Sequence, residues 1–225
     1  MSKSFAWSYS RLNDFETCPR RHYLVAIARE VFEAPSDEMT WGNKVHKALE
    51  LRIKDKTPLP ETLSTYEPLC ATVEARGVGG VVEAEGKLAL NADYEPCTYF
   101  ATDCWVRSIT DFTIVKKAVA FVGDWKTGKE TPASTQLALC AGMTFAHKPY
   151  LTKVITSFVW LKTGRTTNKV FTREQIPEIW QEFLPRVRRF ESAIESGTFP
   201  PKPSGLCRAH CPVPRSKCEH SGKAG

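Results

Sequence analysis

A strand-like segment of the chain ends in a carboxylate and an ammonium group two residues apart. Residues 123–128 read GDWKTG and follow an apolar stretch. Because side chains alternate along a strand, Asp124 and Lys126 project to one face and Trp125 to the other. The carboxylate can hold a hard cation, and the lysine can stabilise a phosphate or orient a water molecule. Taken alone, such a pair is more often an ordinary ion pair at a strand end.

Three further residues favour the metal interpretation. Asp111 lies in an apolar, β-branched stretch, where a carboxylate needs either solvent or a partner, and Glu85 lies on the polar side of the preceding strand. His46 belongs to a helical stretch, in which a lone histidine is usually a capping or surface residue. Together, one histidine, three carboxylates and a lysine suit Mg²⁺ or Mn²⁺.

Eight cysteines form the second unusual feature, because the N-terminus lacks the continuous apolar segment of an export signal. Clustered cysteines in a chain that is not exported indicate metal or redox chemistry rather than disulfides. Cys207, Cys211 and Cys218 lie close together near the C-terminus, and Cys18 can join them if the tail folds back. The alternative is a tail of unligated thiols. The isolated cysteines are expected in the core: Cys70, Cys97 and Cys104.

The elements that must position these residues follow from periodicity. Helical spacing predicts a first helix containing Leu12 and Phe15, then helices over 20–28, 37–54, 59–73, 131–148 and 173–196. Pro68 weakens the fourth of these helices, and Pro185 should kink or split the last. Alternation predicts strands over 82–90, 104–115, 118–126, 151–161 and a short stretch ending near Thr172. Along 82–90, Glu83, Glu85 and Lys87 should share one face. This order predicts a mixed α/β sheet flanked by helices.

Composition sets the broad class of the protein. The 225 residues suggest one large domain, and 42% hydrophobic residues exclude global disorder. The 31 basic and 25 acidic residues give a net charge of +6, which permits an anionic partner without requiring one. No segment is long and apolar enough to span a membrane, so we expect a cytoplasmic protein that does not bind membranes.

Several motifs, taken together, resemble those of a known family. Residues 8–21 (SYSRLNDFETCPRR), residues 42–50 (GNKVHKALE), Asp111, residues 124–129 (DWKTGK) and Gln136 follow one another in the family's order. They resemble the RecB-like branch of the PD-(D/E)XK nucleases, especially the single-domain exonucleases that are related to CRISPR-associated adaptation nucleases and encoded by many phages. The resemblance implies a restriction-endonuclease-like α/β fold in one domain, 1–225. Within it, 1–30 would hold the N-terminal helices with Cys18, 31–196 the nuclease core and 197–225 the cysteine-rich tail.

The resemblance also implies a role for each motif residue. His46, Asp111, Asp124 and the backbone carbonyl of Trp125 would bind Mg²⁺ or Mn²⁺. The catalytic set would be Asp111, Asp124, Lys126, Glu85 and Gln136. Separately, charge clustering and aromatic character suggest DNA contacts at Tyr9, Arg20 and Arg21, whereas Phe15 is better explained as a core residue.

Two motif positions depart from the family, and so does the cysteine spacing. Ser108 replaces a glycine, which should be tolerated, and Cys140 replaces a tyrosine that would contact DNA or order the site. Cys18 with the three late cysteines resembles the family's [4Fe–4S] staple, but both late spacings are one residue longer than usual. Zn²⁺ therefore competes, held by four thiolates or by three with His210 or His220.

The sequence thus predicts a metal-dependent DNA exonuclease that acts on single- or double-stranded ends in recombination, repair or phage DNA metabolism. Such an enzyme would act in the cytoplasm, the host's if the protein is phage-encoded. A recombinase or a single-strand annealing protein would be its protein partner. Two alternatives stay open. One is a non-catalytic DNA-binding partner protein that keeps the nuclease fold, and the other is an endonuclease.

Overall fold

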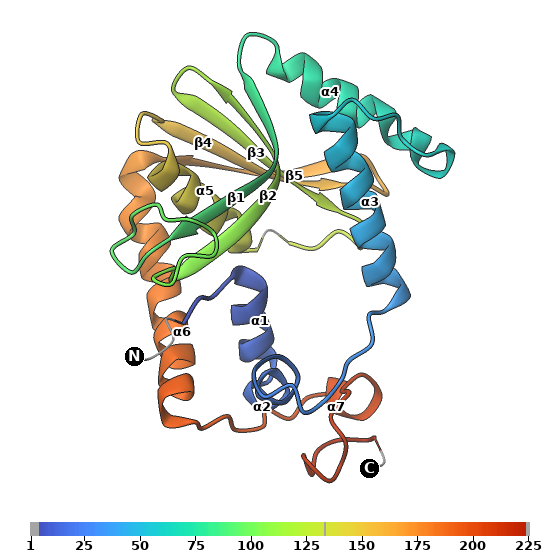
Figure 1. Ribbon diagram of the computed structural model, residues 1–225, viewed down its shortest axis with the longest axis vertical. Coiled ribbons are helices and arrows are strands. Elements are labelled where there is room, and N and C mark those ends of the chain that lie inside the picture. The colour runs from blue at the N-terminus through green and yellow to red at the C-terminus, as the bar shows by residue number, and fades with distance from the viewer. Residues whose placement is uncertain (1–4, 133, 224–225) are drawn as a thin grey trace. The chain divides into compact units, whose positions relative to one another are not determined.

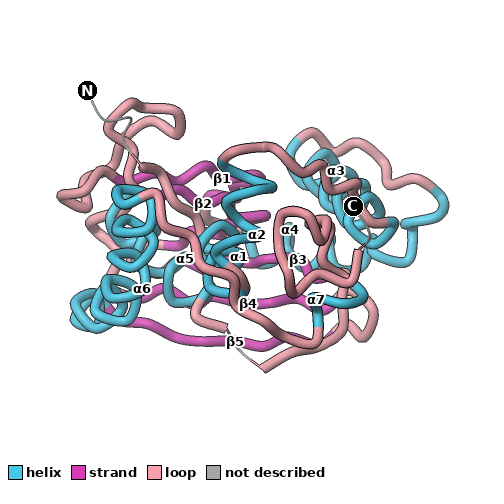
Figure 2. Tube along the Cα trace, turned by 90° about the horizontal axis from the view of Figure 1, so that it is seen from below, coloured by secondary structure: helices cyan, strands magenta, loops and turns pink. Residues whose placement is uncertain are grey.

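A five-stranded mixed sheet organises the chain in the computed structural model, which describes residues 5–132 and 134–223 (Figure 1). The strands are β1 (Val81–Leu90), β2 (Val106–Lys116), β3 (Val119–Lys126), β4 (Lys153–Trp160) and β5 (Arg165–Thr172). They lie in sequence order across the sheet, as Figure 2 shows. All neighbouring strands are antiparallel except β3 and β4, which are parallel. The predicted mixed α/β sheet flanked by helices is confirmed.

Helices precede, interrupt and follow the sheet. The α-helices are α1 (Tyr9–Thr17), α2 (Pro19–His22), α3 (Asp37–Lys54), α4 (Glu67–Gly77), α5 (Gln136–His147), α6 (Ile176–Ser196) and α7 (Leu206–Ala209). A π-helical segment, η1 (Tyr23–Ile27), continues α2, and 3₁₀ turns η2 (Glu61–Tyr66) and η3 (Arg173–Gln175) precede α4 and α6. None of the described helices is long and apolar enough to cross a membrane.

One proline divides a predicted helix, whereas a second proline does not split the helix that contains it. The helix predicted over 59–73 is divided, because Pro68 occupies the first turn of α4, where its missing N–H costs nothing. By contrast, α6 is not split at Pro185 but continues to Ser196. The start of the helix predicted over 131–148 was also wrong, since α5 begins at Gln136 rather than residue 131.

The described chain forms two compact units. One comprises Ser36–Gln181 with the residues up to Ala6, and the other comprises Trp7–Pro35 and Glu182–Gly225. Helix α6 therefore begins in the first unit and ends in the second. That both units form a single folding domain over 1–225 stays a prediction.

In the first unit, helices α3 and α5 cover opposite faces of the sheet. Val159 of β4 packs in one cluster with Val45 and Leu49 of α3, whereas the flanking Phe158 and Trp160 pack with Leu137 of α5. Because successive strand residues point to opposite faces, the two helices must lie on either side. Helix α5 is buried from Leu137 to Phe145, which explains its apolar sequence.

The second unit joins the N-terminal helices to the C-terminal tail. Phe15 of α1 stacks on Phe190 of α6 with 4.5 Å between ring centroids, and Tyr23 stacks on Phe199 of the tail at 4.7 Å. Glu16 accepts hydrogen bonds from both Arg186 Nε and Nη2 at 2.9 and 2.6 Å. The tail thus folds back onto the first helices, as the sequence predicted, and Phe15 is a core residue.

Candidate active site

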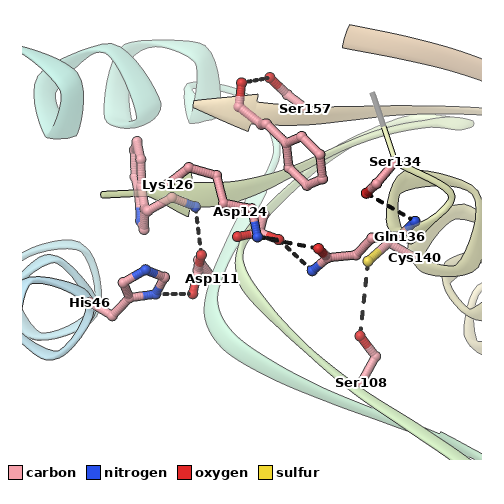
Figure 3. Close-up of polar contacts among 11 residues, drawn as sticks. His46, Ser108, Asp111, Asp124, Lys126, Ser134, Gln136, Cys140 and Ser157 are labelled. Atoms are coloured by element: carbon pink, nitrogen blue, oxygen red, sulfur yellow. Dashed lines mark hydrogen bonds and ion pairs between the residues drawn. The ribbon is translucent and has the colours of Figure 1, made fainter. Parts of the chain in front are cut away.

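The two central carboxylates lie where strands β2 and β3 stop pairing. Their ladder ends at the pair Phe112↔Gly123, and the next residue on each strand is Asp111 and Asp124, respectively. Gly123 allows the close approach at this last pair, because a Cβ there would lie 2.0 Å from the ring of Phe112. The end of this ladder therefore places the two acidic side chains close together beside helix α3 (Figure 3).

The strict alternation predicted for β1 is broken at Glu85. Ala84 packs in the cluster of helix α3, and its neighbour Glu85 lines a cavity with His46 of the same helix, so two consecutive residues face one side. A regular strand cannot do this. The φ angle of +53° at Glu85, in the left-handed region, accounts for the change. Directly across the sheet, Asp111 and Phe112 show the same reversal. This strained backbone turns Glu85 toward the site.

Asp111 links helix α3 to strand β3. Its Oδ1 atom is 2.8 Å from Nδ1 of His46, and its Oδ2 atom accepts a hydrogen bond from the backbone N–H of Trp125 at 2.6 Å. Burial acts to lower the pKa of His46, but its hydrogen bond and charge interaction with Asp111 outweigh burial and raise it. The carboxylate thus fixes the histidine ring and the backbone of the GDWKTG segment at once.

Asp124, Lys126 and Gln136 form a second polar group. The Nζ atom of Lys126 lies 2.9 Å from Oδ2 of Asp124, so both side chains share a face as predicted. Gln136, the first residue of α5, donates from Nε2 to Asp124 at 2.6 Å and accepts from Lys126 at 3.2 Å. Burial raises the pKa of Asp124 to about 6, with Lys126 opposing the rise and Asp111 adding to it. Gln136 therefore orients both members of the charged pair.

An open cavity of about 510 Å³ lies beside helix α3. His46, Glu85 and Asp111 line it together with Ile109 and Thr127. The predicted residues of the nuclease motifs are thus brought together from α3, β1, β2, β3 and the start of α5. Ile109 was not predicted, because its side chain carries no chemical signal and only the register of the strands places it here. Thr127 directly follows Lys126 in the predicted DWKTGK motif.

The donor types fit a hard divalent cation. Carboxylate oxygens and imidazole nitrogen are ligands that Mn²⁺ and Mg²⁺ accept, and the partly buried pair Asp111 and Asp124 brings together negative charge that a cation would neutralise. In the described part of the chain, no three His, Cys, Asp or Glu side chains stand in a ready coordinating arrangement. The hydrogen bond between His46 and Asp111 would therefore give way on binding.

The two departures from the motif pattern lie side by side. The Sγ atom of Cys140 on α5 is 3.9 Å from Oγ of Ser108 on β2. Burial raises the pKa of the Cys140 thiol to about 12, so the group is a neutral thiol. The tyrosine that the resemblance predicts at this position is thus replaced by a buried thiol.

The four cysteines of the predicted staple line one small cavity in the second unit. Backbone N–H groups of Lys202 and Ser204 donate to the sulfur atoms of Cys18 and Cys207 at 3.5 and 3.3 Å. Cys211, Cys218 and His220 line the same cavity, whereas His210 does not. The thiols are therefore gathered as expected, although they too lie outside any ready coordinating arrangement among the described residues.

The predicted DNA-contact residues belong to the second unit. Tyr9 is half-buried at the start of α1, and Arg20 lines the cysteine cavity. Arg21 pairs with Glu33 at 2.5 Å, which reduces its availability to phosphate. Their role in DNA binding stays a prediction.

Comparison with known proteins adds the family context. The model of the PD-(D/E)XK nuclease superfamily matches residues 6–218. A solved structure described as a candidate exonuclease from Eubacterium rectale has a similar fold, with a TM-score of 0.55, 14% identity, and coverage of 91% of this chain and 86% of that chain. The structure of SSO0001 gives a TM-score of 0.47 and 12% identity, covering 94% of this chain and 85% of that one. No curated protein matches this chain in sequence.

Proposed function

Because the chain belongs to the PD-(D/E)XK nuclease superfamily, we propose that it is a metal-dependent DNA exonuclease of the RecB-like branch. It would hydrolyse phosphodiester bonds at DNA ends, in recombination, repair or phage DNA metabolism. The observation that supports this best is the convergence of Asp111, Asp124 and Lys126 at the end of the β2–β3 ladder, beside an open cavity. Location in the cytoplasm and a recombinase or annealing partner stay predictions.

The metal would be held by His46, Asp111, Asp124 and the carbonyl of Trp125, with Glu85 near enough to contribute directly or through water. A bound Mg²⁺ or Mn²⁺ supplies positive charge for the phosphate and lowers the pKa of water. The chain's own contribution is to fix these donors, since the backbone N–H of Trp125 holds Asp111 and the backbone conformation holds Glu85.

Lys126 and Gln136 would act on the phosphate itself. In hydrolysis a water oxygen bonds to phosphorus, the bond to the sugar oxygen breaks, and negative charge grows on the phosphate oxygens. The Lys126 ammonium, held by Asp124 and Gln136, would stabilise that charge. Gln136 has its amide beside both groups and can also contact the phosphodiester.

The cysteine cavity would hold a [4Fe–4S] cluster, with Zn²⁺ as the alternative. Its support is the gathering of Cys18, Cys207, Cys211 and Cys218, with backbone N–H groups directed at two of the sulfur atoms. A brown protein with visible charge-transfer absorption is expected after anaerobic purification. A colourless protein with one equivalent of zinc would select the alternative.

A non-catalytic DNA-binding role is the second candidate, and the buried Cys140 favours it because the family tyrosine is lost. An endonuclease is the third. Linear and covalently closed DNA, each incubated with Mn²⁺ and with a chelator, separate the three. The proposed exonuclease degrades only linear DNA and only with metal. Cleavage of closed DNA indicates an endonuclease. If the DNA stays intact in all reactions, the proposed nuclease activity is refuted.

A further inference from the structure

A group of aromatic and basic residues lies on the sheet beside the candidate active site. Its members come from β1, β2 and the loop between them, and we call them the aromatic–basic patch: Lys87, Tyr99, Phe100 and Arg107. The guanidinium carbon of Arg107 lies 5.3 Å from the ring centroid of Tyr99 and 6.0 Å from that of Phe100. The Nζ atom of Lys87 lies 5.8 Å from the ring of Tyr99. Arg107 thus lies over both rings, and Lys87 lies over the ring of Tyr99.

The patch offers both apolar surface and unneutralised charge. Phe100 is 78% exposed, although burial of such a ring would be favourable. Within the described residues, neither Lys87 nor Arg107 is paired with a carboxylate, and the buried Nε atom of Arg107 has no hydrogen-bond acceptor. Cations that are held by rings rather than by carboxylates keep their charge for an external anion.

A purely structural role explains only part of this group. Tyr99 packs against Ala89 and Cys104, so its ring helps to close the loop onto β1. Phe100 is the next residue and meets Tyr99 edge-on at 5.1 Å, but most of its ring faces solvent. Loop closure therefore accounts for Tyr99 and leaves Phe100 unexplained.

The patch adjoins the cavity that holds the acidic residues. Lys87 pairs directly with Ile109 across β1 and β2, and Ile109 lines the cavity with Glu85 and Asp111. Directly paired residues share a face, and Arg107 shares it too because it lies two residues from Ile109. Along β1, Lys87 is two residues from Glu85, or about 7 Å. A DNA strand in the cavity would reach the patch within its next nucleotides.

We propose that the aromatic–basic patch binds the unpaired bases of a single-stranded DNA segment whose end lies in the active site. The exposed ring of Phe100 stacks on a base, and Lys87 and Arg107 contact the neighbouring phosphates. Stacking requires bases that are not paired, so the patch favours single-stranded over duplex DNA. The inference rests on the proposed nuclease function, from which DNA is taken as the ligand. It adds that the bound DNA is single-stranded rather than duplex.

Binding without catalysis tests the patch. Fluorescence anisotropy in the presence of a chelator measures the affinity for an oligothymidylate of about 12 nucleotides, a length within known single-strand site sizes. Phe100→Ala should weaken binding about tenfold, because stacking contributes 1–3 kcal/mol per base. An abasic strand of equal length should bind wild type more weakly than the oligothymidylate, and Phe100→Ala should remove that difference. Lys87→Gln should reduce the salt dependence by about 0.7 in log–log slope.

Phe32→Ala is the matched control, since Phe32 is 84% exposed and belongs to the other unit. It should bind like wild type. Equal affinity of Phe100→Ala and wild type, or equal affinity of wild type for thymidylate and abasic strands, overturns the inference. Because these measurements need no cleavage, they are independent of the nuclease proposal. If wild type degrades DNA but Phe100→Ala binds DNA as tightly as wild type does, only the patch proposal is refuted. If Phe100→Ala binds DNA more weakly but wild type does not degrade DNA, only the nuclease proposal is refuted.

Discussion

Gly123 is the residue on which the spacing of the two candidate catalytic carboxylates, Asp111 and Asp124, depends most directly. It precedes Asp124 and pairs with Phe112, which follows Asp111. A Cβ at Gly123 would lie 2.0 to 2.7 Å from three ring atoms of Phe112, closer than real Cβ atoms come to any neighbour. The ring cannot simply move aside, because it is 2% exposed and lies 4.6 Å from the ring of Trp125. Gly123→Ala should therefore force β2 and β3 apart.

The expected cost of Gly123→Ala is that of an overpacked core, about 1–3 kcal/mol in the free energy of unfolding. For a chain of this size, each kcal/mol lowers Tm by about 2–4 °C, so a fall of about 2–12 °C is expected. Calorimetry or circular dichroism measures it. Phe112→Leu in the Gly123→Ala background should recover part of the loss, because the two side chains then no longer overlap.

Gly128→Ala is the matched control, because a Cβ there has open space within 4 Å and the position needs no left-handed backbone. Its Tm should equal that of wild type. The reasoning is refuted if Gly123→Ala unfolds at the wild-type temperature, or if both alanine variants are destabilised equally.

Three further outcomes are expected. Gln136→Leu should lower the rate of DNA cleavage about 10- to 100-fold with little change in Tm, since it removes the contacts to Asp124 and Lys126. Mn²⁺ at about 100 times its Kd should stabilise wild type by about 2.7 kcal/mol in thermal melts, and Asp111→Asn should lose most of that gain. Burial lowers the pKa of His147, so the unfolded chain takes up the proton first. The free energy of unfolding should then fall as pH drops below 6.5, and His147→Gln should flatten this pH dependence in denaturant titrations.

The sequence predicts those parts of the site that depend on local patterns. Strand alternation correctly placed Asp124 and Lys126 on one face, and the helical period placed His46 on α3. Both results depend only on neighbours a few residues away, which the sequence displays directly.

What the sequence could not predict depends on contacts between distant segments. The reversal at Glu85 arises from a left-handed backbone opposite Asp111, and no local pattern indicates it. Helix α6 continues through Pro185, although proline removes an intrahelical hydrogen bond, because Phe183 and Val187 are fully buried on either side and hold the helix in place. Tertiary packing overrides the local preference there.

The central claim is that Lys126, held by Asp124 and Gln136, acts directly on the scissile phosphate. The most direct test compares degradation of end-labelled linear DNA in Mn²⁺ by wild type, Lys126→Ala and the exposed control Lys116→Ala. Wild type and Lys116→Ala should degrade the DNA at similar rates, and Lys126→Ala should be slower by about 100-fold or more, with its fold intact by circular dichroism. Degradation by Lys126→Ala at the wild-type rate would contradict the claim.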